Sequence, residues 1–312
     1  MELVSPSPER PAVVFGEAMI ELAGVETDTC RLGVAGDTFN TGVYMARAGV
    51  PTAYMTALGD EAFSERIADA LEAEDLSTDF VLRVRGGTPG LYAVSVDDEG
   101  ERSFTYWRGQ AAVRSFFDHG LSDDIMRRAE RASLLYLSGI SLSLFDRGER
   151  QRIAGLADAV RQKGGVVAFD TNYRPRGWAS REAARAAVTG FAPFVTMALP
   201  TFEDDHLLFG DRSPEACTER WRDAGAEEVV VKNGPDGALT DEGWIAPPEK
   251  VRPVDTTGAG DSFNGAYLSA RLAGSSVSEA ALAAHRLAAK VLMTHGAILP
   301  KEAMADRVPA DG

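Results

Sequence analysis

Short apolar segments alternate with longer helical segments from residue 134 onward, and this alternation restricts the possible folds more than any other feature. The apolar segments have the length of strands, and the segments between them have the length of helices. In chain order, the expected strands and helices are residues 134–137, 146–163, 166–169, 180–189, 194–199, 214–224 and 228–232. Strands that alternate with helices of this length form a parallel sheet with helices on both faces. The sequence therefore predicts an α/β protein with a mostly parallel central sheet.

The first third of the chain departs from this alternation and has more strand character. Residues 88–96 and 102–107, joined by turn residues at 97–100, are typical of an antiparallel hairpin. Segments 19–23 and 31–34 also have strand character, and the simplest arrangement pairs them with the hairpin. These strands predict a small β-sheet that forms a lid on the core.

A helix is expected at residues 37–48, in the same part of the chain. Its apolar residues recur at helical spacing, Asp37 is expected as its N-cap, and Gly49 follows its end. The apolar segment 13–15 is expected as the first strand of the core.

No internal repeat or low-complexity linker divides the chain of 312 residues. We therefore expect one α/β domain at residues 11–300, with lid strands drawn from about 18–35 and 86–108. Residues 1–10 and 301–312 are expected as tails.

The net charge is −15, from 47 acidic and 32 basic residues. A field of this sign repels nucleic acid and anionic membranes, so neither is expected as a partner. No segment approaches the roughly 18 apolar residues of a membrane span, and the polar N-terminus lacks the apolar core of a secretory signal. The two cysteines, Cys30 and Cys217, are far apart, as in proteins of a reducing compartment. We therefore expect a cytoplasmic protein, in which any anionic ligand requires local positive charge.

The most informative segment is residues 254–266, VDTTGAGDSFNGA, in which a turn of small residues leads directly into a helix. Gly258 and Gly260 let backbone N–H groups point at one spot, and the helix N-terminus adds partial positive charge. Together they predict an anion hole suited to phosphate. Asp261 lies at its edge and has two interpretations. It is a general base that deprotonates a hydroxyl group during phosphoryl transfer, or it is a helix cap.

The whole string is more specific than its fragments. Residues 255–266 resemble the C-terminal signature of the ribokinase-like carbohydrate kinases, often called the PfkB family, and residues 35–42 resemble its N-terminal signature. Ala35 stands where that signature usually has a glycine, a small change that keeps a tight backbone. The resemblance covers about residues 13–300 and implies a ribokinase-like three-layer sandwich with ATP-dependent sugar kinase activity.

Within the family, residues 90–92, 104–108 and 170–178 resemble segments of 2-keto-3-deoxygluconate kinases. The implied reaction transfers phosphate from ATP to the terminal (C6) hydroxyl group of this sugar acid. The residues at sugar-contacting positions are Gly36, Asp37, Asn40, Tyr92, Tyr106, Arg108 and Arg174. An acidic sugar suits the arginines, because arginine binds a carboxylate in a bidentate way.

Several of these residues also have a plainer interpretation. Arg108 then faces solvent at a strand end, and Arg174 lies in a loop or pairs with an ATP phosphate. Tyr92 and Tyr106 then pack the lid, because aromatic residues favour strands whatever the function.

The resemblance also implies roles around the transferred phosphate. Asp261 matches the catalytic base of the family, and the anion hole is matched by Gly258, Ala259 and Gly260. The nucleotide-side positions are Asn172, Lys232, Gly234, Thr257, Gly258, Gly260 and His285. Lys232 ends an apolar strand and needs a partner, which is a phosphate or a nearby carboxylate.

Metal ions are expected at two places. Mg²⁺ is expected to bridge the ATP phosphates with few direct protein ligands. Asp255 and Thr257 match positions near a monovalent-cation site of the family, which makes potassium a further candidate. Asn172 and His285 also have structural interpretations, as a turn residue and as a helical histidine.

Several alternatives stay open at this stage. A fructokinase, a nucleoside kinase or a 5-keto-2-deoxygluconokinase would share the fold and the chemistry, but Arg108 and Arg174 would have other roles. A non-catalytic sugar sensor is expected to have lost the catalytic string, which is intact here. A P-loop kinase and a Rossmann oxidoreductase are not supported, because their glycine motifs are missing. The exposed lid strands offer a surface for a homo-oligomer.

Overall fold

The structure is a computed structural model that describes residues 3–25, 29–96 and 102–304. Its centre is a seven-stranded sheet in which all neighbouring strands are parallel. The strand order is β11 (Glu228–Val229), β10 (Met197–Ala198), β9 (Val166–Asp170), β8 (Leu134–Ser138), β1 (Ala12–Phe15), β4 (Thr52–Leu58) and β5 (Leu76–Arg83). The predicted α/β architecture with a parallel central sheet is confirmed.

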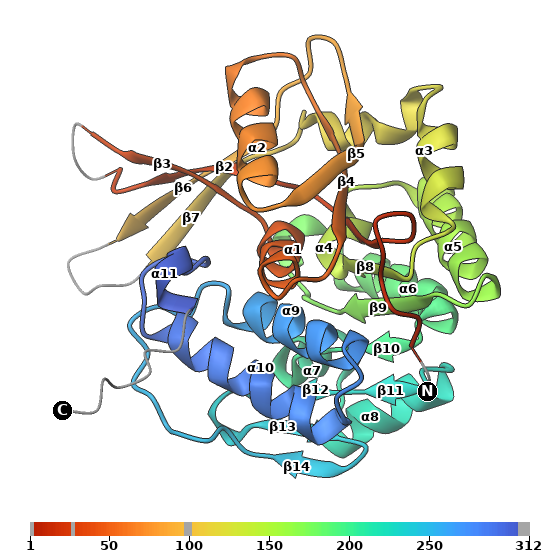
Figure 1. The fold of residues 1–312 in the computed structure, drawn as a ribbon, viewed down its shortest axis with the longest axis vertical. Helices are drawn as coiled ribbons and strands as arrows, with labels where there is room; N and C mark the ends of the chain where they lie inside the picture. Colours follow the sequence, from red (N-terminus) through yellow and green to blue (C-terminus); the bar gives the residue numbers. More distant parts are fainter. Residues whose placement is uncertain (1–2, 26–28, 97–101, 305–312) are drawn as a thin grey trace.

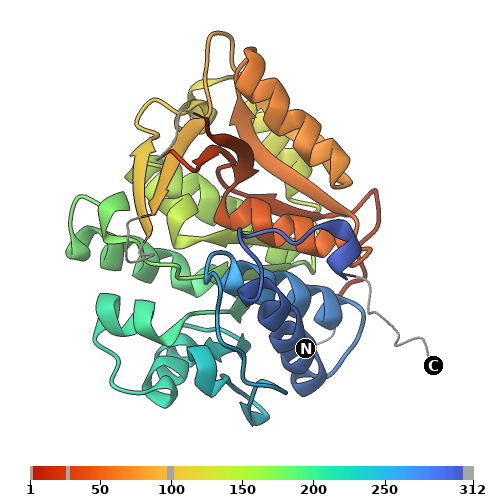
Figure 2. The same ribbon diagram turned by 90° about the vertical axis from the view of Figure 1, so that its left-hand side faces the viewer.

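Helices cover both faces of this sheet and give the three layers of the fold (Figures 1 and 2). Alternate residues of a strand point to opposite faces, so Val14 joins one buried cluster with Phe39 and Phe263, and Val13 joins another with Ile153. The first face is covered by α1 (Asp37–Arg47), α2 (Ala62–Ala73), α9 (Ala259–Leu272) and α10 (Val277–Leu292). The second is covered by α3 (Ser122–Ala129), α5 (Arg147–Gln162), α6 (Arg181–Phe191) and α8 (Pro214–Asp223).

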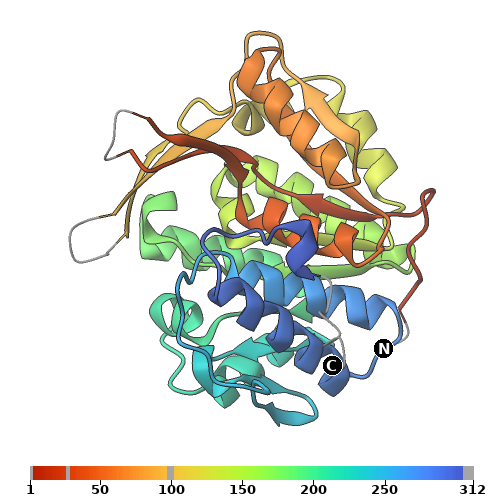
Figure 3. The same ribbon diagram turned by 60° about the vertical axis from the view of Figure 1, so that its left-hand side comes forward.

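A second sheet, which we call the lid sheet, projects from the body (Figure 3). Its order is β3 (Arg31–Ala35), β2 (Met19–Ala23), β6 (Gly90–Val96) and β7 (Arg102–Trp107). Strands β6 and β7 form the predicted antiparallel hairpin, and β2 joins it by a parallel pairing with β6. The predicted turn residues 97–100 lie outside the described residues. The sequence thus predicted all four strands, although not the order in which they pair.

The remaining elements are short. A third sheet, which the sequence analysis did not predict, consists of β12 (Val231–Lys232), β13 (Ala238–Thr240) and β14 (Gly243–Ile245). The short helices are α4 (Gly139–Ser143), α7 (Phe202–Phe209), α11 (Lys301–Met304), η1 (Ala112–Asp118), η2 (Pro175–Gly177), η3 (Ala192–Phe194) and η4 (Gly234–Asp236). Residues expected in the tails also contact the body, since Arg10 donates to the Lys163 carbonyl at 2.6 Å and Lys301 to the Ala73 carbonyl at 2.5 Å.

Two local predictions were wrong. Gly36, not Asp37, is the N-cap of α1, because Asp37 is already helical and its carboxylate bonds to other segments. The strand predicted at 228–232 is split into β11 and β12, because the second part turns to pair with β13.

The order of the main sheet explains the position of the site. Strand β1 is an inner strand of the sheet. From β1 the chain runs outward through β4 to the edge strand β5, and it then returns to β8 on the other side of β1. Ligands of open α/β sheets bind at the carboxyl ends of the strands beside such a reversal. Among the described residues, no helix is long and apolar enough to cross a membrane.

Candidate active site

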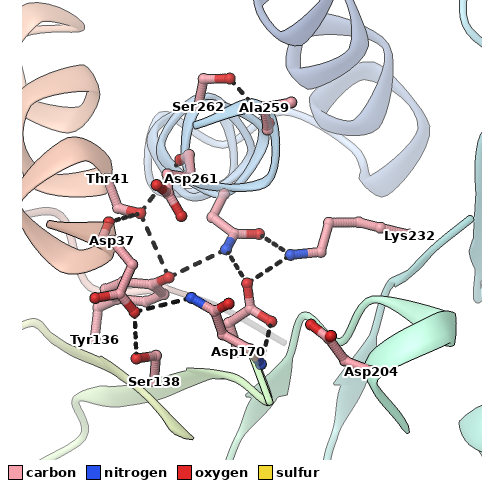
Figure 4. A network of polar contacts seen from close by, with 12 residues as sticks. Asp37, Thr41, Tyr136, Ser138, Asp170, Asp204, Lys232, Ala259, Asp261 and Ser262 are labelled. Atoms are coloured by element: carbon pink, nitrogen blue, oxygen red, sulfur yellow. Dashed lines mark hydrogen bonds and ion pairs between the residues drawn. The ribbon is translucent and has the colours of Figure 1, made fainter. Parts of the chain in front are cut away.

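Asp261 lies where two helix N-termini meet the carboxyl ends of β8 and β9 (Figure 4). It is in the first turn of α9, and Nδ2 of Asn40 donates to its Oδ2 at 2.8 Å. Burial, followed by the negative charge of Asp37, raises the pKa of Asp261 to about 8. A carboxylate with such a pKa is a stronger proton acceptor than an ordinary aspartate once it is ionised, as a general base requires.

The predicted anion hole is a tight turn at the start of α9. Gly258, the N-cap, has a left-handed φ of +76°, and a Cβ atom there would lie 2.6 Å from Cβ of Ala297. Asp255 connects the two loops, since its Oδ1 accepts from the Thr257 N–H at 3.0 Å and its Oδ2 from the Gly296 N–H at 2.6 Å. The turn is therefore closely packed, and only glycine fits at 258. The cation role expected for Asp255 and Thr257 stays a prediction.

Asp37 connects α1 with the ends of two strands. Its Oδ2 accepts from the Ser138 hydroxyl at 2.5 Å and from Nδ2 of Asn172 at 3.0 Å. Burial raises the pKa of Asp37, and these hydrogen bonds oppose the increase. Gly36 is required beside it, because a Cβ atom there would lie 2.3 Å from the Glu17 carbonyl oxygen. Asn172, which was expected beside a phosphate, donates a hydrogen bond to Asp37 in this structure.

Lys232 has a carboxylate partner, the second of the two interpretations. Its Nζ lies 2.7 Å from Oδ2 of Asp170 and 2.9 Å from Oδ1 of Asn264. Asn264 also donates to Asp170 at 2.7 Å and to the Tyr136 hydroxyl at 3.1 Å. These four residues form a buried polar cluster. Tyr136, Asp170 and Lys232 of this cluster lie below Asp261 in Figure 4.

The two predicted carboxylate-binding arginines both have acidic partners. Arg108 pairs with the buried Glu17 at 2.5 Å, and the more exposed Arg174 pairs with Asp204 at 2.9 Å. The charge of Arg108 opposes the increase in the pKa of Asp37 that burial causes. The pKa of Arg174 is raised, against the effect of its burial, first by Asp204 and then by Asp170 and Asp261. Both arginines therefore act electrostatically on the acidic centre of the site.

The lid tyrosines contact each other, with ring centroids 5.6 Å apart. The hydroxyl of Tyr92 donates to Glu21 of the neighbouring strand, and this ring is buried. Tyr106 remains 44% exposed. Tyr92 thus packs the lid, as its plainer interpretation predicted, and the ring of Tyr106 is open to a ligand.

The side chain of His285 contacts other groups of the protein. Its Nε2 lies 3.0 Å from the Ile245 carbonyl oxygen, and its ring meets the edge of Phe263 at 5.1 Å. Burial lowers the pKa of His285, so the neutral imidazole donates from Nε2. Gly234, another nucleotide-side prediction, begins η4 with a left-handed φ of +54°.

Among the described residues, one group of three side chains has metal-ligand spacing, namely Asp205, Asp211 and Cys217, with ligand atoms within 4.8 Å of one another. Arg220 pairs with both aspartates, and Cys217 and Trp221 donate to Asp205. The two carboxylates already have Arg220 as their common partner, so we assign this group no metal.

Comparison with known proteins gives the family of this chain. The profile of the pfkB family carbohydrate kinases matches residues 10–304. The chain belongs to the pfkB family of carbohydrate kinases. It is 40% identical over 308 residues to the 2-dehydro-3-deoxygluconokinase of Escherichia coli (strain K12), covering 95% of this chain and 99% of that one. It is also 40% identical over 304 residues to the enzyme of the same name from Dickeya dadantii (strain 3937), covering 93% and 97%.

Solved structures show the same fold. The 2-dehydro-3-deoxygluconokinase from Thermotoga maritima has a TM-score of 0.83 at 20% identity, covering 95% of this chain and 96% of that one. A PfkB protein from Polaromonas sp. JS666 has a TM-score of 0.81 at 25% identity, covering 91% and 96%. The predicted ribokinase-like fold is confirmed.

Within the site of this pfkB-family chain, sequence reasoning missed five residues: Glu17, Ser138, Asp170, Asp204 and Asn264. Asp170 and Asn264 stood inside segments that had been singled out, at a strand end and within the catalytic string. A polar residue directly after a buried parallel strand was therefore a usable signal. Glu17 and Asp204 had no such signal, because only the fold brings them to their arginines.

Proposed function

We propose that this kinase phosphorylates 2-keto-3-deoxygluconate, also named 2-dehydro-3-deoxygluconate, at its C6 hydroxyl group with ATP. Kinase activity is supported above all by Asp261, whose pKa is raised to about 8 and which Asn40 holds directly after the Gly258–Gly260 turn. The choice of sugar is supported by the names of relatives that are 33–40% identical to this chain.

Each polar group of the site has its own role in the proposed reaction. Asp261 removes the proton of the C6 hydroxyl group, whose oxygen then attacks the γ-phosphorus in line. The N–H groups of the turn at 258–260 stabilise the negative charge that develops on the phosphoryl oxygens. Asn40 has a buried Oδ1 without a partner among the described residues, which suits a sugar hydroxyl donor. Asp37 accepts a further sugar hydroxyl.

Mg²⁺ fits the acidic edge of this site. Asp204 and Asp170 present carboxylates there, and burial together with the charge of Asp170 raises the pKa of Asp204 to about 6. Carboxylate oxygens are ligands that Mg²⁺ prefers, alone or through water. When bound with ATP, the ion supplies positive charge to the β- and γ-phosphates. We propose Asp204 as its protein contact, because both oxygens of Asp170 already accept hydrogen bonds from protein groups.

The substrate carboxylate is proposed to bind Arg108 and Arg174. Each guanidinium has an acidic partner on one side, which fixes its direction while leaving other N–H donors for a ligand. Tyr106 on the lid sheet is 44% exposed, and its hydroxyl group interacts electrostatically with both arginines.

The deciding experiment measures ATP consumption with Mg²⁺ on 2-keto-3-deoxygluconate, its galactonate epimer, 5-keto-2-deoxygluconate, fructose, ribose and adenosine. We expect the highest kcat/KM on a 3-deoxy keto acid. Preference for a neutral sugar would keep the kinase and exclude this substrate. Absence of turnover on every sugar, with sugar binding retained, would favour the sensor.

We also propose that the kinase is a homo-oligomer that associates through the lid sheet. Trp107 of β7 is 58% exposed, on the face of the lid sheet opposite to Tyr106. Light scattering after size exclusion tests this. We expect a multiple of the 33.3 kDa chain, and Trp107→Glu should yield the monomer.

A further inference from the structure

Lys232, the last residue of β12, is a buried lysine behind the anion hole. Its side chain is 8% exposed, and Nζ donates to Oδ2 of Asp170 at 2.7 Å and to Oδ1 of Asn264 at 2.9 Å. A Cβ atom built on Gly260 would lie 3.8 Å from this Nζ. The ammonium group is thus adjacent to the turn that faces the transferred phosphate, although its bonds go to protein groups.

Asn264 connects this lysine to helix α9. It lies three residues after Asp261, about one helical turn, and it is fully buried. Its Oδ1 accepts from Lys232, and its Nδ2 donates to Asp170 and to Tyr136. All the polar groups of the amide are therefore used inside the protein. Because a helix is stiff over one turn, contacts that fix Asn264 also fix Asp261.

Helix α1 fixes the other side of the same turn. The Thr41 hydroxyl lies 3.2 Å from the Asp261 carbonyl oxygen. A Cβ atom at Gly265 would lie 2.7 Å from Cβ of Tyr44, so α1 and α9 are in close contact there. The catalytic turn is thus enclosed by α1 on one side and by the lysine cluster on the other.

We propose that Asp170, Lys232 and Asn264 form a positioning unit for phosphoryl transfer, in which the buried ammonium fixes the first turn of α9 and adds positive charge behind the anion hole instead of binding ATP. The proposal rests on the kinase function proposed above. Preorganised charge behind a site where negative charge develops stabilises the transition state more than the ground state. It assigns to Lys232 and Asn264 an effect on turnover, not on nucleotide affinity.

The charges of this unit also act on the general base. The charged and titratable groups that face Asp261 are Asp37 and Tyr44 on α1, Tyr92 on β6, Tyr136 on β8, Asp170 at the end of β9, Arg174 after β9, and Lys232 on β12. Asp37 and Asp170 raise the pKa of Asp261, and Lys232 lowers it. Removing Lys232 and removing Asp170 should therefore move the pH profile in opposite directions.

The test compares Lys232→Met and Asn264→Ala with the surface control Lys250→Met. We expect kcat to fall by about tenfold or more in the first two variants, while the Kd of MgATP, measured by calorimetry, stays within about threefold. The control should match wild type. If Lys232→Met instead keeps kcat at saturating ATP and loses nucleotide affinity, Lys232 is a phosphate ligand and the proposal is overturned.

The second readout is the acid limb of kcat/KM for the sugar. It should move to higher pH in Lys232→Met and to lower pH in Asp170→Asn. Profiles that superimpose on wild type in both variants would overturn the electrostatic part. Because each single change leaves a buried charge unpaired, the double variant Asp170→Asn/Lys232→Met tests the fold, and we expect it to melt close to wild type with kcat still low.

These experiments distinguish a failure of the proposed function from a failure of the proposed positioning unit. If wild type turns over no sugar of the panel, the proposed function fails. If wild type is active and the double variant keeps wild-type kcat, the function stands and the positioning unit is refuted.

Discussion

Burial gives Asp261 an unusual pKa, which suits the role of general base that we propose for it. Desolvation and the nearby charge of Asp37 raise its pKa to about 8, so the group is largely protonated in mildly acidic solution. A general base must be ionised to accept a proton, and kcat/KM reports ionisation in the free enzyme. The same groups that position the base therefore also set its working pH.

We expect kcat/KM for the sugar to rise with pH along a limb with its midpoint near 8. Below the midpoint it should fall by about tenfold per pH unit as Asp261 takes up its proton. The measurement is a pH–rate profile with saturating MgATP. Asp261→Asn is the control, with turnover lowered by about a hundredfold or more and with no such limb. A limb near pH 4 would mean that the carboxyl keeps its ordinary pKa.

Arg108 is expected to distinguish acidic from neutral sugars. Arg108→Ala should lower kcat/KM for the keto acid about tenfold or more beyond any loss on fructose or ribose, since hydrogen bonds between charged groups contribute roughly 1.5–3 kcal/mol. The change also leaves the buried Glu17 unpaired, so Glu17→Gln/Arg108→Ala is the matched variant. Equal losses on acidic and neutral sugars in that double variant would argue against a carboxylate contact.

Site residues that lie within a short sequence motif were predictable from the sequence. Asp261, Gly258 and Asn40 stood in two short strings, and the structure brings Asn40 and Asp261 into contact across 221 positions. The acidic partners of Arg108 and Arg174 were not predictable, because pairs such as Arg108 with Glu17 are made by the fold. Lys232 was ambiguous for the same reason, since the sequence shows that it needs a partner but not which one.

At the scale of elements, the turn before α9 depends on glycine geometry. Gly258→Ala should lower kcat more than tenfold, because a Cβ atom 2.6 Å from Cβ of Ala297 would displace the anion hole. Gly274→Ala is the matched control, since Gly274 also has a left-handed φ, +91°, but nothing lies within 4 Å of its Cβ position. Both variants have backbone strain of about 1 kcal/mol, so both should lose some thermal stability. Equal turnover in the two would contradict the packing argument.

The elements themselves were largely evident from the sequence. Helix α5 was expected at 146–163 and is found at Arg147–Gln162, with Asp146 and Glu149 as a capping box. Elements were missed where the pattern is uninformative. Strand β4 (TAYMTAL) is buried along its whole length, so it shows no alternation of polar and apolar residues. Helix α2 and strand β5 were missed beside it.

At the scale of the whole molecule, a net charge of −15 means that an anionic ligand requires local positive charge at its site. The sequence suggested that arginines gather into a positive pocket, but Arg108 and Arg174 are each paired with an acid. Under our proposals, the positive potential beside the transferred phosphate comes from the N-terminus of α9 and the glycine turn, with a contribution from Lys232, which is also paired with an acid, Asp170. Only the assembled fold can place these contributions together, and composition cannot reveal them.

The catalytic carboxylate should also reduce the stability of the whole protein. The pKa of Asp261 is about 8 in the folded state, against 3.8 for an ordinary aspartate. The folded state therefore binds its proton more tightly, and this contribution to stability is complete below pH 4 and lost as the pH rises through 8. Asp261→Asn has no charge to bury, so its Tm should exceed that of wild type by about 3 °C or more at pH 9 and should equal it near pH 4. Thermal unfolding at pH 4, 6.5 and 9 measures the difference, with the exposed Asp69→Asn on α2 as the control. A difference that does not change with pH would mean that Asp261 is ionised without cost in the folded enzyme, and its role as a general base near pH 8 would then be lost as well.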